Sequence, residues 1–293
     1  PHAPKKTTAV THVYQRRQPE RTAAYQIVQH HLETWLSRKR EAYPDENPIA
    51  YYVEHDLRKF LQCGILAYGF ARVRCETCAE NFLVAYSCKG RGICPSCNTK
   101  RMFETAAHLV EHRFPRVPVR QWVITLPKRL RYFLLRDSKL TGRVLQISLR
   151  VIERTLREYC PDAPHTAKYG GITYIHRFGS MLNAHLHFHS CLIDGVFAQT
   201  GNGLSFYKTV GITQKVIETA QETIRKRLLR LFVRRDLLSF DEAEAMQNWG
   251  NGGGFSLHAR VQIAANDRKG LERLFRYCAR PIVAVRTLNP ASR

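Results

Sequence analysis

The sequence centres on one stretch, Asn183-Ala-His-Leu-His-Phe-His-Ser-Cys-Leu-Ile-Asp-Gly195, in which three histidines alternate with other residues. Side chains of a β-strand alternate between its two faces, so a strand here would place His185, His187 and His189 on one face. Neutral imidazole is the commonest protein ligand for divalent metals, so aligned imidazoles predict a metal site. The alternative is a half-buried strand whose histidines hydrogen-bond to their neighbours.

The composition indicates a partner of opposite charge. The chain has 293 residues, of which 44% are hydrophobic, and Lys plus Arg outnumber Asp plus Glu by 46 to 24. A surplus of this size favours nucleic acid as the partner, with an anionic membrane surface as the competing explanation. No apolar run reaches the roughly 18 residues that span a bilayer, and no signal peptide opens the chain. We therefore expect a cytoplasmic, nucleoid-associated protein without a membrane anchor.

Five of the nine cysteines crowd into a short region that is typical of a zinc site. Cys75-Glu-Thr-Cys78 and Cys94-Pro-Ser-Cys97 are CxxC motifs at the spacing of a zinc ribbon or knuckle. We therefore predict a structural zinc ion held by Cys75, Cys78, Cys94 and Cys97. Cys63 and Cys88 are either substitute ligands or small buried residues. Redox-active CxxC pairs are the alternative, but no βαβ pattern surrounds these motifs.

Basic residues lie just before and just after the second pair of cysteines. Arg91, Lys100 and Arg101 are placed so that a folded knuckle would carry positive charge on its surface. We expect these side chains to contact phosphates of a nucleic acid. A basic face that is merely solvated is the competing interpretation.

Hydrophobic periodicity predicts an α+β chain. We expect a basic N-terminal helical segment over 1–60, a zinc-binding domain over 61–113, and a third domain over 114–293 that holds an antiparallel sheet flanked by helices. The predicted helices cover 21–40, 49–61, 99–113, 143–159 and 213–234. The predicted strands cover 82–87, 119–126, 171–178, the histidine stretch, 204–207 and a short piece within 256–263.

A further helix is predicted over 268–280, ended by Pro281. Its apolar side carries Leu271, Leu274, Phe275 and Cys278. Tyr277 lies at the edge of that side, with Arg273 and Arg280 beside it at helical spacing. A tyrosine bordered by guanidinium groups can meet a phosphate, and its hydroxyl can act as a nucleophile. The alternative is a tyrosine that packs along the edge of the core.

Together these features favour covalent phosphodiester cleavage. A cation on the histidine strand would polarise the scissile phosphate and spread the charge of the transition state. Tyr277 would attack phosphorus and leave a phosphotyrosine bond, which retains the bond energy needed to rejoin strands without ATP.

The motifs resemble the HUH superfamily of single-strand endonucleases and, more closely, rolling-circle transposases of the insertion-sequence ninety-one family. The resemblance runs from about Asp56 to Pro281. It rests on Cys63-Gly-Ile-Leu-Ala-Tyr-Gly-Phe-Ala-Arg-Val-Arg-Cys75, Ser87-Cys-Lys-Gly-Arg-Gly-Ile-Cys-Pro-Ser-Cys97, Val119-Arg-Gln-Trp-Val-Ile-Thr-Leu-Pro127, the histidine strand and Arg276-Tyr-Cys-Ala-Arg-Pro281.

This resemblance implies an N-terminal transposase zinc-binding domain followed by an HUH nuclease domain. It implies cleavage of single-stranded DNA at element ends and target through a 5′-phosphotyrosine, with Mg²⁺ or Mn²⁺ as the catalytic ion. By position, Cys75, Cys78, Cys94 and Cys97 match its zinc ligands, the three histidines match the HUH strand, and Tyr277 matches the nucleophile.

The chain departs from the family pattern at two points. Many members carry a second tyrosine where this chain has Arg273, so it resembles the single-tyrosine branch. The family also continues well beyond the tyrosine helix, so we expect this chain to be truncated at its C-terminus. Spacing leaves open which histidines bind the ion, with His176 or a distant carboxylate as an outside candidate. A non-catalytic DNA-binding remnant and a plasmid replication initiator or relaxase are the alternative functions, and the zinc knuckle argues against the second.

Overall fold

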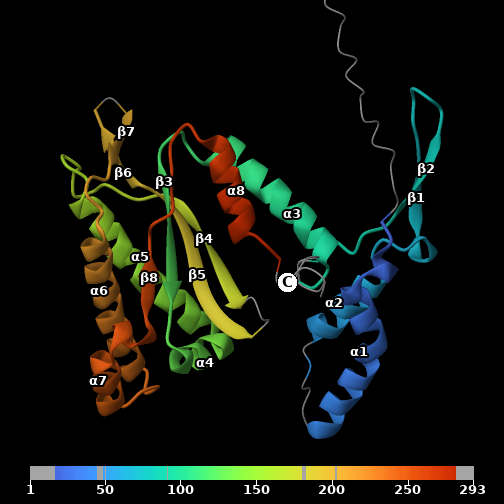
Figure 1. The fold of residues 1–293 in the computed structure, drawn as a ribbon, viewed down its shortest axis with the longest axis horizontal. Helices are drawn as coiled ribbons and strands as arrows, with labels where there is room; N and C mark the ends of the chain where they lie inside the picture. The colour runs from blue at the N-terminus through green and yellow to red at the C-terminus, as the bar shows by residue number, and fades with distance from the viewer. Residues whose placement is uncertain are drawn as a thin grey trace, which may run out of the picture. The chain divides into compact units, whose positions relative to one another are not determined.

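The computed structural model describes residues 17–281, except 45–48, 50, 91, 180–182 and 202. The chain divides into two compact units, one built on residues up to Lys100 and the other on Arg101–Arg280. The first appears in blue and cyan in Figure 1, and the second runs from green to red. The predicted α+β class with antiparallel sheets is confirmed, whereas the predicted boundaries after residues 60 and 113 stay predictions.

The first unit begins with two packed helices and continues into a hairpin. Its apolar contacts join Leu32 and Leu36 of the first long helix to Ile49 and to partly buried residues of the second. The side chain of Thr22 accepts a hydrogen bond from the backbone N–H of Tyr25 and so caps the first helix. The elements are η1 (Pro19–Arg21), α1 (Ala23–Ala42), α2 (Tyr51–Gln62), η2 (Leu66–Tyr68), β1 (Phe70–Arg74), β2 (Asn81–Ala85) and the start of α3 (Pro95–His108).

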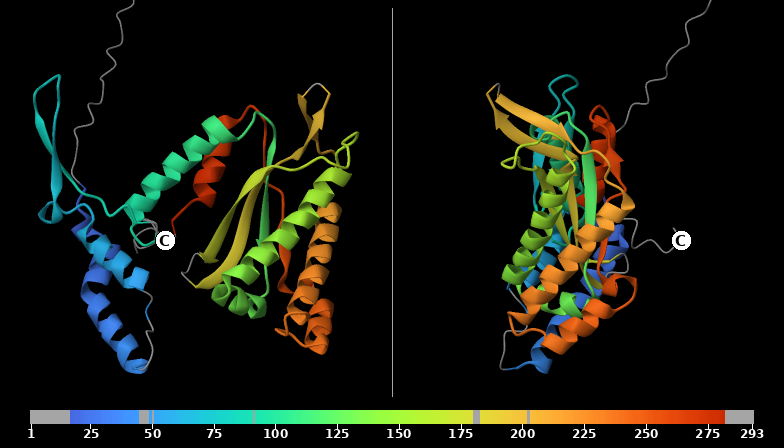
Figure 2. Two further views of the ribbon diagram at one scale, coloured as in Figure 1. Left: turned by 180° about the vertical axis from the view of Figure 1, so that it is seen from behind. Right: turned by 90° about the vertical axis from the view of Figure 1, so that its left-hand side faces the viewer.

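The second unit is organised around an antiparallel sheet with the strand order β4-β5-β3-β8, in which β9 also pairs with β3. Strand β5 lies between β3 and β4, so the histidine stretch occupies the middle of the sheet (Figure 2). The strands are β3 (Val119–Thr125), β4 (Gly171–Phe178), β5 (Ala184–Ile193), β8 (Ser256–His258) and β9 (Gln262–Ile263).

Alternation along β5 gives the sheet two different faces. Leu186, Phe188 and Leu192 point into the larger core, which they share with Trp122 and Ile124 of β3. The helices that cover this face are α4 (Lys128–Arg136), α5 (Ser138–Glu158), α6 (Gln214–Val233) and α7 (Phe240–Asn248).

The opposite face carries the odd-numbered residues of β5. Cys191 belongs there to a second apolar cluster that contains Leu274, Phe275 and Cys278 of α8 (Arg268–Cys278). The same cluster includes Val110 of the π-helical turn η3 (Leu109–Arg113) that follows α3. Figure 1 shows α8 on one side of the sheet and α5 and α6 on the other. The histidine face is therefore the face that α8 covers.

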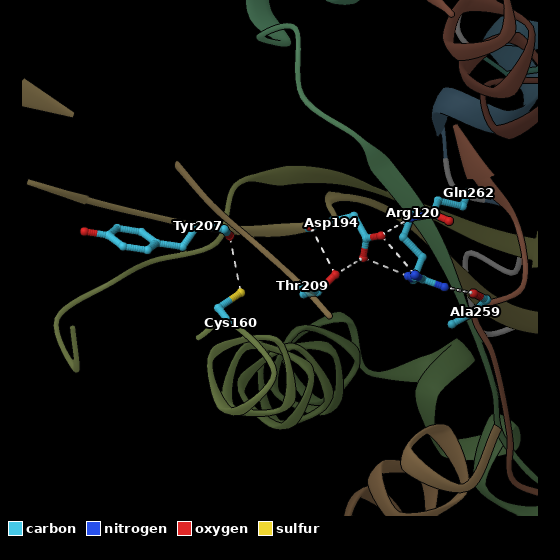
Figure 3. Close-up of polar contacts among 7 residues, drawn as sticks. All are labelled: Arg120, Cys160, Asp194, Tyr207, Thr209, Ala259 and Gln262. Atoms are coloured by element: carbon cyan, nitrogen blue, oxygen red, sulfur yellow. Dashed lines mark hydrogen bonds and ion pairs between the residues drawn. The ribbon is translucent and has the colours of Figure 1, made fainter. Parts of the chain in front are cut away.

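Asp194, at the end of β5, is the centre of a buried polar network (Figure 3). Arg120 donates from Nε and Nη2 to the two carboxylate oxygens at 2.8 and 2.9 Å, and its Nη1 donates to the carbonyl oxygen of Ala259. The hydroxyl of Thr209 donates to Oδ1 at 2.8 Å, and the amide of Gln262 also donates to this carboxylate. Bidentate and charge-assisted bonds of this kind are among the stronger ones in proteins. The network ties β3 and β5 to the segments around β7 and β9.

The Asp194-Gly195 turn signal marks the passage from β5 into a separate hairpin of β6 (Gly195–Thr200) and β7 (Gly203–Lys208). A Cβ at Gly195 would come within 2.3 Å of the carbonyl oxygen of Tyr207, so this close pairing requires glycine. The same carbonyl accepts a hydrogen bond from the thiol of Cys160, just after α5 (Figure 3). The hairpin is thereby anchored to the helical layer.

Most predicted elements are present within a few residues of their predicted limits. The predictions omitted α4, α7, β1 (Phe70–Arg74) and β6, all of which are short. Helix α3 starts at Pro95 rather than at residue 99, so Cys97 lies in its first turn. Among the described residues, no helix is both long enough and apolar enough to cross a bilayer.

Candidate active site

Three imidazoles come together on the α8 side of the sheet. Strand β4 pairs with β5 so that His176 stands directly opposite His187, with His189 two residues further along the same face. One ring nitrogen from each of these histidines lies within 4.8 Å of the others. The ring centroids of His176 and His189 are 4.6 Å apart, and those of His187 and His189 are 5.0 Å apart.

The structure corrects the predicted trio at one position. His185 shares the face, with its ring centroid 4.9 Å from that of His187, but the compact group contains His176 in its place. The reason is the antiparallel pairing: His176 stands across from His187 and its ring is also 4.6 Å from that of His189, whereas His185 and His189 are four residues apart along β5. The buried Nε2 of His185 has no hydrogen-bond partner among the described residues.

Two of the grouped histidines have their tautomers fixed by backbone carbonyls. Nε2 of His176 is 2.7 Å from the carbonyl oxygen of Cys278, and Nδ1 of His187 is 2.8 Å from that of His185. A carbonyl oxygen only accepts, so each of these nitrogens carries the proton in the neutral ring. In each ring the other nitrogen keeps a lone pair that a cation could use. This nitrogen is Nδ1 in His176 and Nε2 in His187.

The third histidine is held by an amide. Nδ1 of His189 lies 2.9 Å from the side-chain nitrogen of Gln121 on β3, and that nitrogen also contacts the thiol of Cys278 at 3.3 Å. A 180° flip of the Gln121 amide would place its oxygen at this position, where it could accept a hydrogen bond from Nδ1–H of His189. Nε2 of His189 would then keep a lone pair for a cation. Gln121 therefore holds the His189 ring through Nδ1.

Burial favours the uncharged ring of His176, His185 and His189. Desolvation lowers the pKa of His176, and it lowers the pKa of His189, whose side chain is nearly inaccessible, to about 4. Desolvation and the nearby guanidinium of Arg131 also lower the pKa of His185. Metal ligation requires neutral imidazole, so a site made of His176, His187 and His189 fits a divalent cation chemically.

Tyr277 stands beside this group. The apolar side of α8 is buried as predicted, with Leu271, Leu274, Phe275 and Cys278 packed on the sheet, whereas Tyr277 is 53% exposed. Its ring centroid lies 5.7 Å from that of His189, edge to face. The guanidinium carbon of Arg280 is 5.6 Å from the Tyr277 ring centroid, and Arg273 is exposed one turn earlier on α8. The exposed phenol of Tyr277 therefore lies beside both the guanidinium of Arg280 and the histidine group.

In the first unit, four thiols form a second metal-ligating group. Cys63 follows α2, Cys88 follows β2, and Cys94 and Cys97 lie at the start of α3; all four sulfurs are within 4.8 Å of one another. Sγ of Cys63 is 3.6 Å from that of Cys94 and 3.7 Å from that of Cys97. Sulfurs bound tetrahedrally at about 2.3 Å from zinc are about 3.8 Å apart, so this group has the size of a zinc tetrahedron.

The predicted ligand set is therefore corrected for its first CxxC pair. Cys75 and Cys78 lie in the turn of the β1–β2 hairpin, where the backbone N–H of Ala79 donates to the carbonyl of Cys75. Cys63 and Cys88 lie at the other end of that hairpin, where Gly64 N–H bonds to the carbonyl of Tyr86. The hairpin is five residue pairs long, so its two ends supply different cysteines.

Hydrogen bonds within the cluster favour one thiolate. The thiols of Cys88 and Cys94 and the backbone N–H of Cys88 lower the pKa of Cys63. The hydrogen bond to Cys63 raises the pKa of Cys88, and it also raises the pKa of Cys94 to about 11. Zinc binds thiolates, so metal binding would displace the remaining protons from the cluster.

Two family models match the chain. Residues 27–126 match the model described as "Transposase zinc-binding domain", and residues 170–292 match the model described as "Putative transposase". The chain is an IS91-type transposase. No curated protein and no solved structure gave a significant match.

The two family matches each cover one of the groups of side chains that could hold a metal ion. The cysteine cluster falls inside the first match and supports structural zinc in the transposase, while the histidine group and Tyr277 fall inside the second. A transposase is a DNA-processing enzyme, so DNA binding is implied. Of the predicted DNA-contacting residues near the cysteines, Lys100 and Arg101 lie on α3, whereas Arg91 lies outside the described residues.

The sequence analysis gave His176 only as an outside candidate for the cation site, and it did not identify Gln121. His176 follows a run of alternating residues in β4, and only the strand register places it opposite His187. Gln121 lies in the predicted strand at 119–126, and its role as a partner of His189 follows from the same pairing. A histidine in the strand next to a histidine-rich strand was the available signal for His176.

Proposed function

We propose that this transposase nicks and rejoins single-stranded DNA, with Tyr277 as the nucleophile beside a divalent cation held by His176, His187 and His189. The observation that carries the proposal is the position of Tyr277, half exposed with its ring 5.7 Å from that of His189. A scissile phosphate above this surface would meet the phenol, the histidine group and Arg280 together.

The chemistry exchanges one phosphodiester bond for another. Oη of Tyr277 attacks phosphorus, the bond from phosphorus to the 3′ oxygen breaks, and the phenolic proton passes to solvent. The products are a 5′-phosphotyrosine and a strand that ends in a 3′-hydroxyl. A bound divalent cation supplies neutralisation of the charge that develops on the phosphate. Attack of a 3′-hydroxyl on the phosphotyrosine reverses the bond exchange and joins strands.

The chain's own residues orient the reactants. The buried side of α8 fixes the helix on the sheet, so Tyr277 has a defined position at its exposed edge. Arg280 and Arg273 are placed to hold phosphate oxygens on either side of the tyrosine. With a single tyrosine at this point of α8, the same residue would have to be freed before it acts again.

The choice of cation rests on the family rather than on ligand type. Imidazole ligands suit Zn²⁺, Cu²⁺, Fe²⁺ and Ni²⁺. The resemblance to HUH nucleases instead implies Mg²⁺ or Mn²⁺. We therefore propose Mn²⁺ or Mg²⁺ at the histidines. We assign the structural zinc ion of the first unit to Cys63, Cys88, Cys94 and Cys97.

A covalent adduct tests this function. The full chain is incubated with a labelled pool of single-stranded oligonucleotides and Mn²⁺, and the products are separated on a denaturing gel. We expect a protein-linked band that is lost in Tyr277→Phe and kept in Tyr132→Phe, a matched change at another exposed tyrosine of the same unit. Cleavage that persists in Tyr277→Phe would refute the tyrosine assignment. Binding on a native gel without an adduct under any divalent ion would instead identify a DNA-binding remnant.

A further inference from the structure

A basic groove runs between the helices that cover the far face of the sheet. It has a volume of about 790 Å³ and is formed by α5, α6 and α7. Among the described residues, its cationic lining consists of exposed side chains of both long helices: Arg143, Arg150, Lys226, Arg227, Arg230 and Arg234. Glu244 is the carboxylate that lines it, and Glu222, outside it, is 3.6 Å from Lys226.

This groove lies on the other side of the sheet from the histidines. Helices α5 and α6 pack on the core that contains Leu186 and Phe188, whereas His187 and His189 point toward α8. Figure 2 shows α5 and α6 together on that side. A ligand in the groove would therefore be separated from Tyr277 by the thickness of the sheet.

The cations form two rows. On α5, Arg143 and Arg150 are seven residues apart, which is two turns and about 10 Å along the axis. On α6, Arg227, Arg230 and Arg234 repeat at three- and four-residue spacing and so share one side. A neighbouring hollow of about 350 Å³ also includes Arg227 and extends along both helices to Lys215. Two rows of positive charge along a shared groove fit a linear polyanion better than a single anion.

The floor of the groove is apolar. Ile147 of α5, Leu229 and Val233 of α6, and Ala243 of α7 line it between the charged rows. Phe240, at the start of α7, also lines it and is 71% exposed, so its ring is available to a ligand. Charged walls with an apolar floor and an exposed aromatic ring are the features that hold a single nucleic-acid strand, whose bases are free to stack. A duplex turns its bases inward and would leave the floor and Phe240 unused.

We propose that the groove of α5, α6 and α7 binds a second segment of single-stranded DNA, apart from the strand at Tyr277. Phosphates lie along the two rows of arginines, and a base stacks on Phe240. The proposal rests on the charge and shape of the groove and does not require the tyrosine chemistry to be correct.

Affinity measurements test the groove directly. In the full chain carrying Tyr277→Phe, Arg150→Gln, Arg227→Gln and Arg230→Gln are combined, and binding of a labelled oligothymidylate is followed by fluorescence anisotropy at several salt concentrations. Loss of three phosphate contacts should lower the slope of log affinity against log salt by about 2. The matched control combines Arg116→Gln, Arg136→Gln and Lys208→Gln, exposed residues outside the groove. Equal slopes in the two triple variants would overturn the proposal.

Phe240→Ala separates base stacking from general attraction. Because Phe240 is exposed, its removal should leave the thermal unfolding temperature unchanged while weakening oligothymidylate binding by about five- to 150-fold. An unlabelled duplex of equal length should compete poorly for the groove. Unchanged affinity in Phe240→Ala, or competition by the duplex as strong as by the single strand, would reject a single-strand site.

The covalent reaction distinguishes this proposal from the proposed function. With Tyr277 intact, the groove variants should still form the adduct on a short oligonucleotide but should lose affinity for a long one. If no adduct forms in any variant, the tyrosine chemistry fails, while the anisotropy result still decides the groove. If adduct formation on the short oligonucleotide falls together with binding in the groove variants, the two strands are not separate and the proposal of a second site fails.

Discussion

Nε2 of His176 donates a 2.7 Å hydrogen bond to the carbonyl oxygen of Cys278, the residue that follows Tyr277. Carbonyls in the last turn of a helix have no partner within the helix, so this bond satisfies one of the open acceptors of α8. It also places the proton of the neutral His176 ring on Nε2, so Nδ1 keeps a lone pair that a cation could use. One contact therefore connects the candidate cation site to the helix of the candidate nucleophile.

Replacing His176 should weaken cation binding more than replacing His185. We expect His176→Ala to raise the Mn²⁺ concentration for half-maximal adduct formation at least tenfold, roughly the loss seen when support for a metal ligand is removed. His185→Ala removes an imidazole of β5 that shares the face but lies outside the compact group, and it should change that concentration less than about threefold. Titration of both variants with Mn²⁺ measures the difference. A larger effect in His185→Ala would restore the trio that the sequence alone predicted.

The cysteine cluster predicts which thiols retain zinc. Cys63→Ser and Cys88→Ser should each lower the zinc content of the purified chain well below one ion and destabilise the first unit, because structural zinc contributes of order 10 kcal/mol in small zinc domains. Cys75→Ser and Cys78→Ser change the turn of the exposed hairpin and should leave the zinc content unaltered. Elemental analysis and thermal unfolding measure the two effects. If only Cys75→Ser and Cys78→Ser lost zinc, Cys75 and Cys78 would be the ligands instead.

The lowered histidine pKa values predict instability in acid for the metal-free protein. Because the pKa of His189 falls from 6.5 to about 4 on folding, the unfolded chain takes up a proton at higher pH than the folded chain. Its contribution to stability is therefore complete above about pH 6.5, declines as the pH falls toward 4, and then levels off. The slope from this residue is at most about 1.4 kcal/mol per pH unit, and His176 acts in the same direction.

Urea unfolding across this pH range tests the effect, with His189→Gln as the comparison. The free energy of unfolding of the variant should depend less steeply on pH between 6.5 and 4 than that of the parent. Parallel curves would show that His189 is not kept neutral by burial.

The Asp194 network predicts a large loss of stability from a small change. Asp194→Asn leaves the guanidinium of Arg120, whose side chain is 12% exposed, without its charged partner. Breaking a buried ion pair from one side typically costs about 3–5 kcal/mol, so we expect a loss of that order in the free energy of unfolding. Glu158→Gln breaks the exposed pair with Arg154 and should cost less than about 1 kcal/mol. Chemical denaturation measures both variants. If Asp194→Asn and Glu158→Gln lowered the free energy of unfolding by similar amounts, burial would not set the strength of the Asp194–Arg120 pair.

Much of the fold could be predicted from local patterns. Strands β3, β4 and β5 and helix α8 were evident from residues that alternate or recur every three to four positions. The burial of Leu271, Leu274, Phe275 and Cys278 follows from the same periodicity and is confirmed. The position of Tyr277 at the edge of that buried side was likewise predictable, because it depends on one helix alone.

The parts that could not be predicted depend on how separate elements pair. His176 joins His187 because of the register between β4 and β5, and register is not fixed by either strand alone. Cys63 and Cys88 join Cys94 because both lie at the open end of the β1–β2 hairpin, whereas Cys75 lies at its turn. The basic groove arises from two helices that are far apart in sequence, each of which reads as an ordinary amphipathic helix.

The order of the elements along the chain also has a consequence in time. The histidines lie in β4 and β5, and β8, α8 and Tyr277 follow them in the sequence. Ribosomes deliver the chain from its N-terminus, so the histidine strands emerge before the helix that completes the site. Under the proposed tyrosine chemistry, a nascent chain that still lacks α8 has the histidines but no nucleophile, and so it would not form the covalent bond to DNA.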